Sequence, residues 1–258
     1  MNFDDGLSEE CIRKIIGSFR DNFTLSGKIL RADQQIMLLS IAAERLSNLG
    51  TDFLNSNFDT VSESFYDRLF SDLQFIQARS CGKLEQNRFS SLCLAYLRDD
   101  KKGRATDSIK VYMGLLGAKS MIHKTSEKPF GDFIYKASLK KLESIVLDKA
   151  IKYLDLCLKN KSFYGEMNYN RDFFYGLKTV IIELAVSLAL AKYFAFHRQS
   201  DPLVIEQGDL ESAINLISEK SGKSAFLRNA IFNVINRQLA DSSSLHAIVN
   251  ALTFGKGK

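Results

Sequence analysis

Glu183 is the residue of this sequence that most clearly calls for a chemical explanation. It lies in the most apolar stretch of the chain, residues 179–196, in which Lys192 is the other charged residue. A carboxylate in apolar surroundings must be paired, protonated or turned toward a cavity, because burying an unpaired charge is costly. We therefore interpret Glu183 in two ways: it is one side of a structural ion pair, or it is a buried carboxylate of a functional site.

The histidines do not form a chemical motif. They are His123, His197 and His246, and they stand far apart in the chain. His197 ends the apolar stretch beside Arg198, where a cation interacts favourably with the negative end of a helix dipole. We expect a structural role for His197, and the sequence assigns no catalytic residue.

The four cysteines lack the spacing of a metal site. They are Cys11, Cys81, Cys93 and Cys157, and no two of them form a CxxC pair. Two thiols such as Cys81 and Cys93 need further ligands to bind zinc, so we expect no metal. Each of three thiols falls on the apolar side of a helical pattern, where a cysteine behaves as a small hydrophobic residue; they are Cys11, Cys93 and Cys157. Free thiols are typical of a reducing compartment, which predicts a cytoplasmic protein.

Glycine-rich phosphate loops are incomplete in this chain. Gly222-Lys223-Ser224 looks like the end of a P-loop, but the first glycine of that motif is replaced by Ile217, and the preceding segment has a helical pattern where the motif requires a strand. Gly114 and Gly117 likewise lack the spacing of a dinucleotide-binding loop. We expect no cofactor.

An aromatic cluster follows the middle of the chain. Its members are Phe163, Tyr164, Tyr169, Phe173, Phe174 and Tyr175. One interpretation is that these rings fill the core between helices, and the other is that they form a docking surface for a peptide or a partner helix.

Apolar residues recur at helical spacing along most of the chain, and the only prolines are Pro129 and Pro202. Ser8 is placed to cap a first helix, and Gly50 follows a helix over 31–49 at the position of a left-handed C-terminal cap. The segment 208–211 starts a later helix, with Asp209 as its expected cap. The pattern predicts an all-α, irregular bundle of roughly nine or ten helices around the central apolar helix, because no stretch alternates with a period of two. We expect a single helical domain over 1–258, with possible subdivision near 99–104 or 123–130.

Composition excludes some classes of function. Hydrophobic residues make up 45% of the 258 positions and charged residues 25%, as in ordinary globular proteins. The formal net charge of +5 is spread among acidic residues, so we do not expect a nucleic-acid partner, whose binding needs basic groups on one face. We expect no secretory signal, because the first residues include no apolar stretch, and 179–196 is short for a membrane span.

Three segments resemble the C-terminal helical region of bacterial flagellin lysine-N-methylases. They are Gln34 to Leu39, Ile181 to Lys192 and Gly208 to Ser218. The family also carries an N-terminal Cys-rich part with closely spaced cysteines, and nothing equivalent occurs here. The resemblance thus implies a divergent relative whose catalytic competence is in doubt, and no family residue can be assigned to a position of this chain.

Two functional hypotheses follow. The first is a helical protein-interaction domain that docks a protein partner near the aromatic cluster. The alternative, implied by the resemblance, is an S-adenosylmethionine-dependent methyltransferase acting on the lysine side chains of flagellin.

Overall fold

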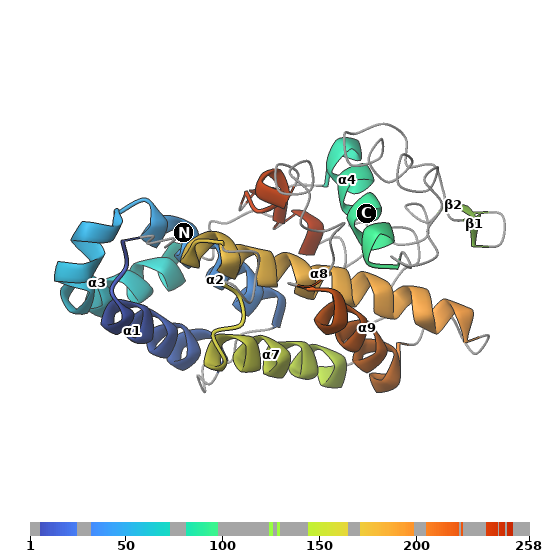
Figure 1. The fold of residues 1–258 in the computed structure, drawn as a ribbon, viewed down its shortest axis with the longest axis horizontal. Coiled ribbons are helices and arrows are strands. Elements are labelled where there is room, and N and C mark those ends of the chain that lie inside the picture. Colours follow the sequence, from blue (N-terminus) through green and yellow to red (C-terminus); the bar gives the residue numbers. More distant parts are fainter. Residues whose placement is uncertain are drawn as a thin grey trace. The chain divides into compact units, whose positions relative to one another are not determined.

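The computed structural model describes residues 6–24, 32–72, 81–97, 124–125, 128–129, 144–164, 171–198, 205–221, 223, 236–241, 243–245 and 247–249. Its longer elements are the helices α1 (Glu9–Phe19), α2 (Ala32–Ser47), α3 (Thr51–Asp72), α4 (Lys83–Leu97), α7 (Ser144–Lys159), α8 (Phe173–His197) and α9 (Gln207–Lys220) (Figure 1). A π-helical turn, η1 (Arg20–Thr24), extends α1, and residues 236–239 are also helical. In the described part of the chain, strands are limited to the antiparallel pair β1 (Lys124–Thr125) and β2 (Lys128–Pro129). The predicted all-α class is confirmed.

The chain forms two compact units. Unit 1 consists of Met1–Ala78 and Asp148–Ile181, and unit 2 of Arg79–Leu147 and Ile182–Lys258. Helix α8 supplies residues to both units, which is possible because it is apolar on all sides and can serve as a core element in each. Both segments that we considered as points of division, 99–104 and 123–130, lie in the sequence of unit 2.

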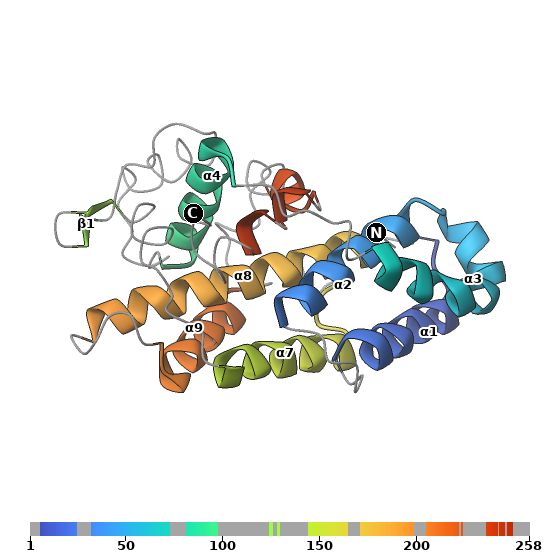
Figure 2. The same cartoon turned by 180° about the vertical axis from the view of Figure 1, so that it is seen from behind.

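In unit 1, the first helix forms as its sequence predicts. The side chain of Ser8 accepts a hydrogen bond from the backbone N–H of Cys11 at 3.1 Å and caps α1. The apolar face of the helix is buried, and it consists of Ile12, Ile15, Ile16 and Phe19. Helix α1 lies beside α3 in both views (Figures 1 and 2), and Lys14 donates a hydrogen bond to Asp59 of α3 at 2.6 Å.

The corner between α2 and α3 depends on a left-handed glycine. Gly50 has φ 81°, as its predicted role in ending α2 requires. The helix itself ends at Ser47, two residues before the predicted boundary. Leu49, the last residue of the predicted helix, therefore lies beyond the end of α2 and is 41% exposed.

Two ion pairs connect the remaining helices of unit 1. Arg20 of η1 binds Asp155 of α7 through two hydrogen bonds of 2.8 and 3.2 Å. Lys178 of α8 lies 3.4 Å from Glu44 of α2. The π-helical turn also places Phe23 in the core, where its ring centroid is 5.7 Å from that of Tyr66.

Helix α8 begins earlier than the apolar stretch suggests. It runs for 25 residues from Phe173, so it is long and apolar enough to cross a membrane, but 83% of its most apolar window is buried inside the protein. That burial is typical of the core helix of a folded domain, in agreement with its predicted central position.

In unit 2, helix α9 starts differently from the prediction. Its N-cap is Glu206, and Asp209 is the third residue of the helix. The Asp209 carboxylate accepts a hydrogen bond from the backbone N–H of Glu206 at 2.8 Å, so it still satisfies a free donor at the helix start. The prediction of Asp209 as the cap was wrong because the helix starts at Gln207.

Candidate functional site

Glu183 is the centre of a buried polar cluster in unit 2. It lies in α8 and is 4% exposed. Its Oε1 atom accepts hydrogen bonds from the hydroxyl groups of Tyr96, at 2.9 Å, and of Ser221, at 2.5 Å. Tyr96 belongs to the last turn of α4, and Ser221 is the C-cap residue of α9. One carboxylate oxygen therefore connects three helices.

The chemistry of this cluster favours a structural role. Hydroxyl groups that donate to a carboxylate form charge-assisted hydrogen bonds, which satisfy a buried negative charge. A carboxylate is a weak base for a serine hydroxyl, and catalytic serines are usually activated by histidine or lysine. Ser187 adds a hydrogen bond from its hydroxyl to the backbone oxygen of Glu183, at 2.9 Å. The cluster thus fixes the position of α8 in unit 2.

Cys93 lies one turn before Tyr96 and is fully buried. Burial raises its pKa well above the ordinary thiol value, and a protonated thiol is neither a nucleophile nor a metal ligand. Cys81 is half-buried and is not part of a disulfide. Among the residues that the structure describes, no three His, Cys, Asp or Glu side chains are grouped as a metal site would require.

Lys192 is the second charged residue of the apolar stretch, and the sequence-based predictions gave it no role. It is 3% exposed, and desolvation lowers its pKa to about 7. The signal was available in the sequence, because a lysine between Ala191 and Tyr193 in an apolar helix is expected to be buried. An amine with this pKa changes its charge near neutral pH.

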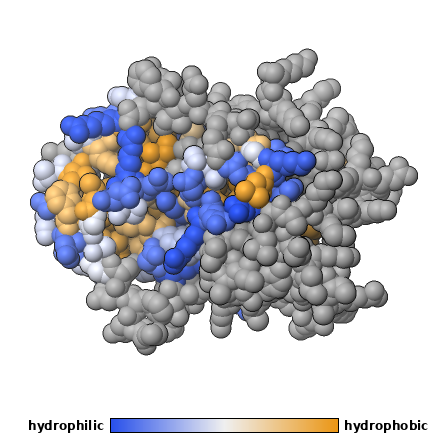
Figure 3. Space-filling model, turned by 90° about the horizontal axis from the view of Figure 1, so that it is seen from above, coloured by the Kyte–Doolittle hydropathy of each residue, from blue (hydrophilic) through white to orange (hydrophobic). Residues whose placement is uncertain are grey.

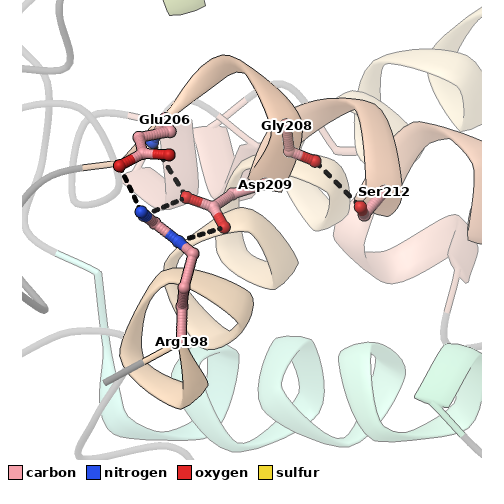
Figure 4. A network of polar contacts seen from close by, with 5 residues as sticks. All are labelled: Arg198, Glu206, Gly208, Asp209 and Ser212. Atoms are coloured by element: carbon pink, nitrogen blue, oxygen red, sulfur yellow. Dashed lines mark hydrogen bonds and ion pairs between the residues drawn. The ribbon is translucent and has the colours of Figure 1, made fainter. Parts of the chain in front are cut away.

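A second polar network joins the end of α8 to the start of α9 (Figure 4). Arg198, directly after α8, forms ion pairs with Glu206 and with Asp209, the latter at 2.7 Å. A second hydrogen bond, from Nε of Arg198 to Asp209, measures 3.2 Å. Asp209 is buried, so the arginine neutralises a carboxylate that would otherwise destabilise the start of α9. This network is accounted for by stability alone.

His197 has the structural position that the sequence predicts. It lies in the last turn of α8, and its ring packs against Tyr193 with 4.4 Å between centroids. His123 and His246 lie outside the described residues.

The aromatic cluster belongs largely to the core of unit 1. Phe163 and Phe173 are fully buried, with ring centroids 5.3 Å apart, and Phe174 is 8% exposed. Tyr164 and Tyr175 are half-buried, and Tyr169 lies outside the described residues. The three phenylalanines cannot form a docking surface, because they are buried and their rings pack against one another. The core-filling interpretation accounts for them.

The chain matches no protein-family model, curated protein or solved structure. The resemblance to flagellin lysine-N-methylases therefore stays a prediction that depends on the residues quoted for it.

The partners of Glu183 allow a quantitative test of its role. We expect Glu183→Leu to destabilise unit 2 by ~1–3 kcal/mol, because the buried Tyr96 hydroxyl loses its acceptor. The double variant Glu183→Leu/Tyr96→Phe should recover most of this loss, since both polar groups are then replaced by apolar ones. Urea unfolding followed by circular dichroism measures both. A double variant less stable than the single one would show that the Tyr96 hydroxyl contributes to stability through contacts other than the one with Glu183.

Proposed function

We propose that this chain is a helical protein-interaction domain that docks its partner through the corner between α2 and α3 in unit 1. The observation that carries the proposal is the exposure of two large apolar side chains four positions apart, Leu49 at 41% and Phe53 at 46%. Leu49 lies in the turn after α2 and Phe53 in the first turn of α3, and exposed apolar side chains that gather in one region of a surface are candidate contacts for a protein partner. Figure 3 shows apolar side chains among polar ones on the surface of unit 1.

The position differs from the one that the sequence suggests. We predicted docking near the aromatic cluster, but the phenylalanines of that cluster are buried. The other large apolar side chains that are exposed in the described residues, Leu84 and Leu156, belong to α4 and α7 and stand alone in their helices. Single exposed apolar residues are common on any protein surface and need no partner.

Affinity capture from the native cell tests this proposal. The purified chain is compared with the double variant Leu49→Ser/Phe53→Ser and with Leu156→Ser, which removes a side chain of similar exposure, 52%, from another helix of unit 1. We expect a specific protein to be retained by the wild-type chain and by Leu156→Ser, and to be lost with the double variant. Equal retention by all three chains would contradict the proposal.

Calorimetry distinguishes the methyltransferase hypothesis from the proposed interaction domain. We expect titration with S-adenosylmethionine to give no binding heat, because the proposed function needs no methyl donor. Stoichiometric binding of S-adenosylmethionine would instead support the methyltransferase function and contradict the proposed one.

A further inference from the structure

We draw no further inference here: the strongest candidate, the exposed apolar pair Leu49 and Phe53 at the corner between α2 and α3, belongs to the site already proposed, and nothing in the described part of the chain shows what covers it.

Discussion

Replacing Gly176 by alanine is expected to destabilise unit 1 by ~3 kcal/mol or more. Gly176 is the fourth residue of α8, and its backbone N–H donates to the oxygen of Asp172 at 2.8 Å. A methyl group at this position would overlap the carbonyl oxygen of Phe163 and lie 2.8 Å from its carbonyl carbon. These are backbone atoms, so they cannot move aside as a flexible side chain would.

The surroundings of Phe163 make the clash hard to relieve. Its ring is fully buried and packs against Tyr164 and Phe173, with centroids 5.4 and 5.3 Å away. Moving the Phe163 backbone would displace this packed ring as well, and overpacked sites relax only by shifting their neighbours. The backbone of Phe163, which follows α7, therefore lies so close to the first turn of α8 that only glycine fits at position 176.

Gly17→Ala is the matched control. Gly17 lies within α1 of the same unit, and an added Cβ there would meet no atom within 4 Å. Alanine is the better helix former, so this variant should be ~0.5–1 kcal/mol more stable than the wild type. Urea unfolding of both variants gives the comparison. Similar stability of Gly176→Ala and Gly17→Ala would mean that the close approach of Phe163 is not maintained in solution.

Local features of the fold were predictable because they are encoded by neighbouring residues. Ser8 caps α1, and Gly50 adopts the left-handed conformation after α2, as the sequence predicts. The start of α3 is not evident from the sequence, because apolar residues after Gly50 recur at helical spacing only from Phe58 onward. The helix begins at Thr51, and this earlier start places Phe53 on its exposed side.

The polar cluster of Glu183 shows why sites are harder to predict than helices. The sequence indicates that this carboxylate is buried, and it is. The hydroxyl donors are Tyr96 and Ser221, which lie 87 and 38 residues away in the chain. We considered a basic partner for the carboxylate, whereas these two contacts come from neutral hydroxyls. Only the packing of α4, α8 and α9 determines which side chains meet, and periodicity contains no information on that pairing. The same limit applies to Gly176, whose sequence neighbours do not reveal the approach of Phe163.

Lys192 should be the residue whose replacement stabilises the protein most. Its pKa is lowered to about 7 by burial, whereas an unfolded lysine titrates near 10.4. Between these two pH values the unfolded chain binds more protons than the folded chain, so stability rises with pH across that window. Near pH 7 and below, folding bears the full cost of burying or deprotonating the amine, ~3–5 kcal/mol. Lys192→Met keeps the apolar stem and removes this cost.

We therefore expect Lys192→Met to exceed the wild type by ~3 kcal/mol at pH 7, and expect this difference to shrink toward zero near pH 10. Burial raises the pKa of Tyr193 above its ordinary value, and titrating groups that are common to both chains cancel in the difference. Lys192→Arg provides the opposite case, because a guanidinium cannot lose its proton at these pH values and should destabilise the helix. Urea unfolding of the three chains at several pH values measures all of these effects. A difference between Lys192→Met and the wild type that does not change from pH 7 to pH 10 would show that the amine is not desolvated in the folded protein.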